Sequence, residues 1–177
     1  MKRISFANTQ CSLAQSLDMI GEWWTLLIVR EAYFGTRRFS DFQSQLGIAR
    51  NVLSERLDRL VANDILHRVP VTTQSKRAHY RLTEKGRDLI AVVIALIQWG
   101  DRWIMGPDNA PIRMVDRGSG EDIDALQVRA KDGRALELQD IRLEPGPGAD
   151  DAIRDRFGEA ITNSGAVRWR VRRHVAT

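Results

Sequence analysis

The clearest periodic pattern in the chain lies between Leu46 and Leu66. Apolar residues recur there at the spacing of one helix face: Leu53, Leu57, Leu60 and Val61. The opposite face carries short polar side chains and arginines. This arrangement is typical of a helix that covers a core, and it also suits a helix that reads the DNA major groove. The neighbouring segments decide between these two interpretations.

Two helices are predicted upstream, over residues 12–20 and 23–34. The first places Leu13, Leu17 and Ile20 at helical spacing. The second is apolar almost all round and is followed by a glycine, so we expect it to be the buried central helix of a small bundle. Trp23 and Trp24 belong to this helix. Core packing is their expected role, and the floor of an effector pocket is the alternative.

A short helix is predicted between this central helix and the segment that opened the pattern. Ser40 and Gln43 form the S-x-x-Q pattern of a capping box, and Gly47 marks the end of the helix. The next helix is placed at 50–63, after a tight connection. Two helices joined by a short turn that contains glycine, the second with a polar outward face, indicate a helix-turn-helix.

After residue 64 the hydrophobic period changes from about four to about two. Two strands are predicted, at 65–69 and 78–82, with Pro70 at a strand end because proline cannot donate to a ladder. The polar segment 72–77 between them carries Lys76 and Arg77. A basic β-hairpin directly after a helix-turn-helix predicts a winged helix.

A long helix is predicted from Glu84 to about Ile104, capped by Thr83. It has two apolar stripes, one formed by Leu89, Val93, Leu96, Gly100 and Trp103 and the other by Ile90, Ile94 and Ile97. A single helix in a small monomer rarely needs two apolar faces. We therefore expect one face to pack on the winged helix and the other on a second copy of the chain. A two-fold dimer would place two reading helices roughly 34 Å apart.

From Gly106 onward, Gly, Pro and Asp become common, which predicts a boundary between residues 1–105 and residues 106–177. Strands are expected at 112–115 and 141–143, a hairpin around Asp132-Gly133, and a helix over 150–161. The last eleven residues alternate apolar and basic side chains and suit an edge strand or a second polyanion contact. The predicted fold class is mainly α with a small β-hairpin wing, plus a small C-terminal α+β extension.

Charge is distributed unevenly along the 177 residues, whose net charge is +4. Residues 1–105 hold 15 Lys or Arg against 10 Asp or Glu, and residues 106–177 hold 12 against 13. Between Arg50 and Arg87 there are nine basic and four acidic residues. This local excess suits a polyanion partner such as double-stranded DNA, although a solvated basic surface would look the same.

Several classes of protein are disfavoured by the composition. The longest apolar run, 89–97, is shorter than the roughly 20 residues of a membrane helix, and no N-terminal signal is visible. The single cysteine excludes an internal disulfide framework and fits a reducing compartment, so a cytoplasmic protein is expected. The three histidines show no metal spacing, and no nucleophile–base pattern or phosphate-binding glycine loop is present. We expect neither enzyme activity nor a cofactor.

Several motifs together resemble one known family. They are Cys11, D-x-I-G-x-W at 18–23, T-L-L-I-x-R-E at 25–31, G-x-x-R-F at 35–39, I-A-R-N-V-L-S-E-R-L at 48–57 and Y-x-L-T-x-x-G at 80–86. In this order they resemble the HxlR family of bacterial winged-helix regulators, which are related to the MarR group. The resemblance covers about residues 8–105. It implies a homodimer that binds operator DNA and dimerises through terminal helices outside the wing.

The resemblance also implies which residues contact DNA. The reading helix would be 50–63, and the DNA-binding residues would be Arg50, Asn51, Ser54, Glu55, Arg56 and Arg59, with Lys76 and Arg77 in the wing. Two positions depart from the family pattern. Ala49 stands where many relatives have a serine cap, so a side-chain acceptor is lost. Glu55 brings negative charge towards DNA, which is tolerable if it accepts from a cytosine amino group or pairs with Arg59.

Two further features of the family have counterparts here. Some relatives have a metal-binding-like C-terminal extension, but Ser119, Arg129 and Asp132 stand where its thiolates would be, so no structural zinc is expected. Cys11 stands where some members sense oxidants or electrophiles. It precedes a predicted helix, which favours the thiolate, but a small buried residue at the dimer seam is the expected role.

Three functions therefore remain open from the sequence. The first is a sequence-specific DNA-binding regulator, acting as a repressor. The second is a protein-interaction module that keeps the winged fold without reading DNA. The third is a small-molecule sensor built on the first, with an effector between Trp23, Trp24 and the long helix.

Overall fold

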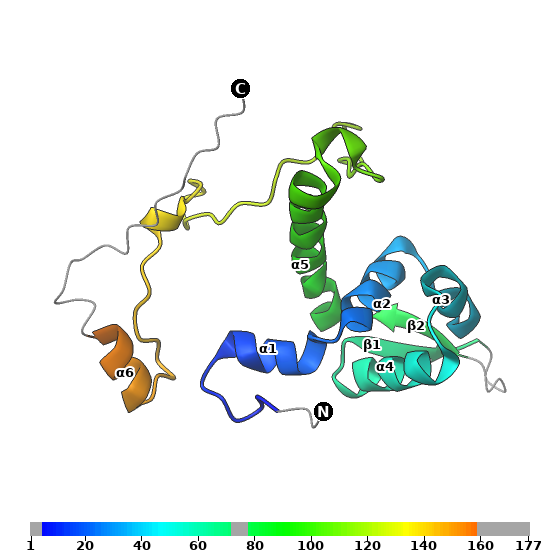
Figure 1. The fold of residues 1–177 in the computed structure, drawn as a ribbon, viewed down its shortest axis with the longest axis horizontal. Coiled ribbons are helices and arrows are strands. Elements are labelled where there is room, and N and C mark those ends of the chain that lie inside the picture. Colours follow the sequence, from blue (N-terminus) through cyan, green and yellow to red (C-terminus); the bar gives the residue numbers. More distant parts are fainter. Residues whose placement is uncertain (1–4, 72–77, 159–177) are drawn as a thin grey trace. The chain divides into compact units, whose positions relative to one another are not determined.

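A computed structural model describes residues 5–71 and 78–158 (Figure 1). The chain divides into two compact units, residues 1–125 and 126–177. This division falls later in the chain than the change in composition at residue 106. The predicted wing contacts Lys76 and Arg77, and the basic C-terminal segment, lie outside the described residues.

The first unit begins with four helices: α1 (Ser12–Ile20), α2 (Trp23–Phe34), α3 (Phe39–Leu46) and α4 (Arg50–Ala62). The predicted ranges of α1, α2 and α4 are confirmed to within one residue. Gly47 ends α3 in the left-handed region, at a φ of 62°, and its N–H donates to the Gln43 carbonyl at 3.0 Å. A residue with a Cβ would be strained at this φ, so the glycine sets the sharp turn between α3 and α4.

The N-terminus of α3 differs from the prediction. The helix begins at Phe39, and Arg38 occupies the N-cap position without a side-chain hydrogen bond. Ser40 lies inside the first turn, where its hydroxyl donates to Asp41 Oδ1 at 3.0 Å. The predicted capping box is therefore wrong, because helical geometry starts before Ser40 and its hydroxyl does not accept from the backbone.

The wing strands are β1 (Leu66–Pro70) and β2 (Ala78–Leu82), which pair antiparallel with Leu66 opposite Leu82. Pro70 ends β1, as predicted. The Tyr80 N–H donates to the Arg37 carbonyl at 2.8 Å, so the connector between α2 and α3 lies beside β2. The helix-turn-helix and the hairpin are therefore joined by backbone as well as by side chains.

The core of the first unit lies between α2, α3, α4, the hairpin and the first half of α5. The side chains of Phe42, Leu53 and Leu57 are fully buried, and Phe42 contacts Tyr80 edge to face, with ring centroids 6.3 Å apart. The prediction that α2 is buried all round is only partly correct. Ile28 and Val29 are fully buried, whereas Tyr33 and Phe34 near its C-terminus are about half exposed.

Helix α5 (Glu84–Gly100) continues into a π-helical turn at Asp101–Met105 and extends away from α2 and β2 (Figure 1). Thr83 caps it as predicted, and its hydroxyl accepts from the Gly86 N–H at 3.0 Å. Gly86 packs so closely on the connector between α4 and β1 that an added Cβ would lie 2.1 Å from the Ile65 carbonyl oxygen. This contact holds the start of α5 against the segment that joins α4 to β1.

The predicted extension is less regular than its hydrophobic pattern suggested. In the first unit, a tight turn is closed by a bridge between Val115 and Asp122. In the second unit, a bridge between Arg129 and Ala135 closes the predicted Asp132-Gly133 hairpin, and α6 (Asp151–Gly158) follows. The strand expected at 141–143 is wrong within the described residues, since a short 3-10 helix at Leu138–Asp140 precedes an unpaired segment there.

Candidate nucleic-acid interface

The outward face of α4 carries a row of exposed polar side chains: Arg50, Asn51, Ser54 and Glu55. The opposite face is anchored by Leu53, Leu57 and Leu60, which are at most 2% exposed. Ala49 occupies the N-cap position without a side-chain hydrogen bond, as the sequence indicated. The helix is thus seated firmly in the core while its N-terminal half presents hydrogen-bonding groups to solvent.

Two charged side chains of this face, Arg50 and Glu55, have partners within the protein. The Arg50 guanidinium lies 5.5 Å from the centroid of the Phe39 ring, which links the starts of α3 and α4. Glu55 Oε1 lies 3.2 Å from Arg56 Nη1, so its partner is Arg56 and not Arg59. The carboxylate that would otherwise repel phosphate is therefore partly neutralised by its neighbour.

Arg56 and Arg59 take part in contacts inside the protein. The Arg56 side chain is only 14% exposed, and its Nη2 atom lies 3.4 Å from Glu22 Oε2 at the start of α2. The Arg59 guanidinium donates to the Asp18 carbonyl near the end of α1. Both arginines were predicted to contact DNA. In the structure Arg56 lies between Glu22 and Glu55, and Arg59 contacts the end of α1.

Arg68 is a basic residue of this region that the sequence analysis did not single out. It is exposed on β1, forms an ion pair with Asp58 of α4, and its guanidinium lies 5.6 Å from the centroid of the Tyr80 ring. It follows buried Leu66 by two residues, so it lies on the face of the hairpin that is turned towards α4. The two-residue alternation of the strand, from Leu66 to Arg68, was the signal in the sequence that could have identified it.

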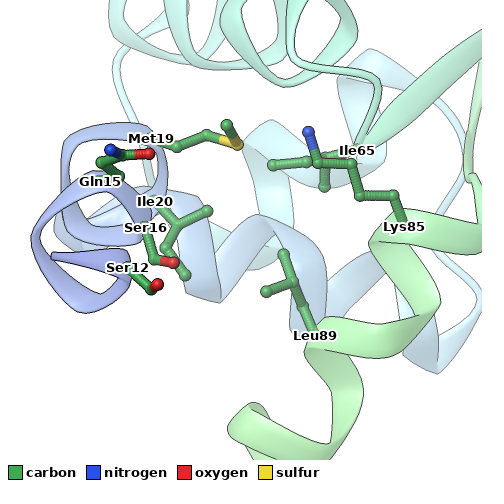
Figure 2. A pocket seen from close by; sticks show the side chains of 8 residues that line it. All are labelled: Ser12, Gln15, Ser16, Met19, Ile20, Ile65, Lys85 and Leu89. Carbon is green, nitrogen blue, oxygen red and sulfur yellow. The ribbon is translucent and has the colours of Figure 1, made fainter. Parts of the chain in front are cut away.

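The two tryptophans of α2 have different environments. Trp24 is half-buried and packs against the core, whereas Trp23 is 86% exposed, so the expected core role is wrong for Trp23. A cavity of about 300 Å³ lies between α1 and α5, with Met19, Ile20 and Leu89 among its lining residues (Figure 2). Neither tryptophan lines this cavity.

Cys11 is the N-cap residue of α1 and is exposed. A thiol in this position is accessible to solvent and lies at the positive end of a helix dipole. Across residues 5–71 and 78–158, no three His, Cys, Asp or Glu side chains come together in a way that could hold a metal ion. None of the helices in those same ranges is long and apolar enough to cross a membrane.

Comparison with known proteins yields matches along most of the chain. An uncharacterized HTH-type transcriptional regulator of Mycobacterium tuberculosis (strain ATCC 25618 / H37Rv) is 42% identical over 137 residues, which cover 77% of this chain and 87% of the relative. The crystal structure of PA1607, described as a transcription factor, matches with a TM-score of 0.73 and 41% identity over 80% of this chain and 99% of that one. PA1374 from Pseudomonas aeruginosa matches with a TM-score of 0.59 and 36% identity, over 82% and 99%.

The helix-turn-helix, the hairpin and these matches define the class of protein as a winged-helix, DNA-binding transcriptional regulator. The model of the HxlR-like helix-turn-helix family matches residues 19–108. The chain belongs to this family. The fold class expected from the sequence, mainly helical with a two-stranded wing, is confirmed.

Proposed function

We propose that the protein is a homodimeric, sequence-specific repressor that places α4 in the DNA major groove. The observation that carries this proposal is the exposed polar row on α4, backed by fully buried leucines. A helix held rigidly in the core can offer hydrogen-bonding groups to base edges without a large entropic cost. The wing residues Lys76 and Arg77 are proposed to contact phosphates beside it.

Each side chain of the row has a distinct proposed role. Asn51 has the donor and acceptor that pair with adenine N6 and N7, and Arg50 suits guanine or a phosphate. Ser54 can donate to either a base edge or a phosphate oxygen. Glu55 is proposed to accept from a cytosine amino group while Arg56 partly neutralises it.

Arg56 and Arg59 are proposed to orient the reading helix instead of contacting base edges. Their partners, Glu22 and the Asp18 carbonyl, lie at the junction of α1 and α2. A side chain held in this way is not free to extend into the groove without giving up its partner.

Dimerisation is proposed to use exposed apolar side chains at the C-terminal end of α5 and in the π-helical turn that follows it. Large apolar side chains there are between 50% and 69% exposed: Leu96, Trp99, Trp103 and Ile104. Several large apolar side chains exposed in one short segment are typical of a protein–protein interface. A two-fold axis at this segment would give the dimer two reading helices for the two halves of a palindrome.

Selection of bound DNA from a random duplex pool tests the function. We expect an enriched palindrome with half-sites about one helical turn apart, and binding that weakens steeply as salt rises. Equal and weak affinity for every duplex would contradict the proposal and favour an interaction module with a winged fold. A reporter under the selected site separates repression from activation.

A redox response through Cys11 is proposed as a regulatory layer on this function. Its support is the exposure of the thiol at the start of α1. Diamide takes two electrons and two protons from two thiols, so with one cysteine per chain it should join Cys11 of two protomers in a disulfide. This should lower the operator affinity of the native protein and leave that of Cys11→Ser unchanged. Unaltered affinity of the native protein after diamide or methylglyoxal would exclude sensing through this residue.

A further inference from the structure

A second basic site lies in the first unit, built from elements other than α4. A hollow of about 410 Å³ is lined by residues of α2, the following connector, β2 and α5. Three arginines line it: Arg37, Arg81 and Arg87. The remaining lining residues are apolar or aromatic: Ala32, Tyr33, Leu82 and Ile90. No Asp or Glu belongs to this lining in the described part of the chain.

The three arginines differ from other arginines of the same unit in their partners. Arg30, Arg56 and Arg68 each form an ion pair with a carboxylate. Within residues 5–71 and 78–158, no such pair is formed by the arginines of the hollow. Three like charges around one depression, without internal compensation, produce a local positive potential that an anion would relieve.

Two of these side chains are already held in place. Arg37 Nη1 donates to the carbonyls of Ala32 and Thr36, the latter at 3.1 Å. Arg87 Nη1 donates to the Leu82 carbonyl at 3.3 Å. Each guanidinium has five N–H donors, so donors remain for a ligand after these bonds are formed. Anchored arginines lose less side-chain entropy when an anion binds.

The walls of the hollow indicate what else the ligand carries. Tyr33 is 52% exposed, and Leu82 and Ile90 add apolar surface beside it. A guanidinium fork matches the oxygen geometry of phosphate, and a volume of this size is within the range of small-molecule sites. We propose that this hollow binds a small organic phosphate, with the dianionic phosphate on the arginines and an apolar or aromatic body against Tyr33.

The proposal goes beyond DNA reading, and it can be tested without DNA. Phenyl phosphate is the probe, titrated calorimetrically into the full-length protein at physiological salt, with benzoate as the monoanionic control. We expect saturable binding of phenyl phosphate and much weaker binding of benzoate. Arg81→Met and Arg87→Met should each weaken the binding at least about tenfold, because each removes charge-assisted hydrogen bonds.

Two matched variants control for the loss of one positive charge. They are Arg38→Met and Arg50→Met. Arg38 follows Arg37 in the sequence but does not line the hollow, and Arg50 is on α4. Neither should change the affinity for phenyl phosphate. Circular dichroism of each variant checks that the fold is retained, and Arg37 is left unchanged because it holds the end of α2.

Three results would overturn the proposal. The first is the absence of saturable binding. The second is that Arg50→Met loses binding while Arg81→Met keeps it, which would assign the phosphate to the DNA-reading face. The third is equal affinity for benzoate and phenyl phosphate. Since all three are measured without DNA, they are independent of whether an operator is found.

Discussion

Arg56 of α4 and Glu22, the N-cap residue of α2, form an ion pair with Nη2 and Oε2 3.4 Å apart. The exposed fraction of the side chain is 14% for Arg56 and 31% for Glu22, so water screens the pair only in part. The Arg56 Nε atom is buried without a hydrogen-bond partner, which offsets some of the gain. The pair links the middle of α4 to the start of α2.

Replacement of Arg56 with methionine should therefore lower stability. We expect the free energy of unfolding in urea to fall by about 1–2 kcal/mol, less than for a fully buried pair because of the exposure and the unsatisfied Nε. Arg38→Met, which removes an exposed arginine, should change it by less than about 0.5 kcal/mol. If Arg56→Met kept full stability and only reduced the salt dependence of DNA binding, Arg56 would be a phosphate contact instead.

Two glycines of α5 should respond in opposite ways to alanine. Gly86→Ala places a Cβ 2.1 Å from the Ile65 carbonyl oxygen, a rigid backbone atom, so we expect a loss of about 2 kcal/mol or more. Gly100→Ala meets no atom within 4 Å in helical backbone and should raise stability by about 0.5–1 kcal/mol. Thermal and urea unfolding of both variants measure this. A tolerated Gly86→Ala would mean that α5 is not packed as closely on the connector between α4 and β1 as described.

The helices were predictable from the sequence where one apolar face meets the core. The spacing of Leu53, Leu57 and Leu60 is enough to place α4, and the glycines after α2 and α3 mark their ends. Caps were less predictable because they depend on where helical geometry begins. Thr83 forms its predicted cap, whereas the capping box at Ser40 is displaced by a helix that starts at Phe39.

The arginines of the site illustrate what periodicity cannot provide. Arg50, Arg56 and Arg59 look alike in the sequence, but only Arg50 belongs to the exposed row. The other two find partners 34 and 41 residues earlier in the chain, at Glu22 and Asp18, and such distant pairing leaves no periodic signal. Trp23 was expected in the core because it is a large apolar residue in an apolar helix, but it is 86% exposed.

The oligomeric state should depend on the exposed face of α5. The Leu96→Glu, Trp99→Glu double variant places two like charges in the proposed interface and should shift the protein to monomer. Sedimentation velocity across a range of concentrations measures the change. Leu138→Glu, at a residue that is 67% exposed in the second unit, is the control and should leave the dimer unchanged. A double variant that remained dimeric would place the interface elsewhere.

The turn at 116–121 should respond to acid. The N–H groups of Ser119 and Gly118 donate to Asp116 Oδ1 at 2.7 and 2.8 Å, and these bonds lower the pKa of Asp116 below its ordinary value. Because the folded pKa is the lower one, the carboxylate supports the turn above the ordinary aspartate pKa, and this support is lost as pH falls through the folded pKa. Amide NMR shifts of Gly118 and Ser119 should report that low transition, and Asp116→Asn should abolish it.

The proposed division of roles between α4 and the wing gives the most discriminating prediction. Asn51→Ala and Ser54→Ala should each alter preference at particular base pairs, with a cost of about 1–3 kcal/mol at the position read, because they remove groups that are proposed to face base edges. Lys76→Ala and Arg77→Ala should weaken binding to all sequences and lower the slope of log affinity against log salt by about 1 each. Binding to a panel of single-base operator variants at several salt concentrations separates the two patterns. A uniform loss from Asn51→Ala, with base preference unchanged, would remove α4 from the role of reading helix.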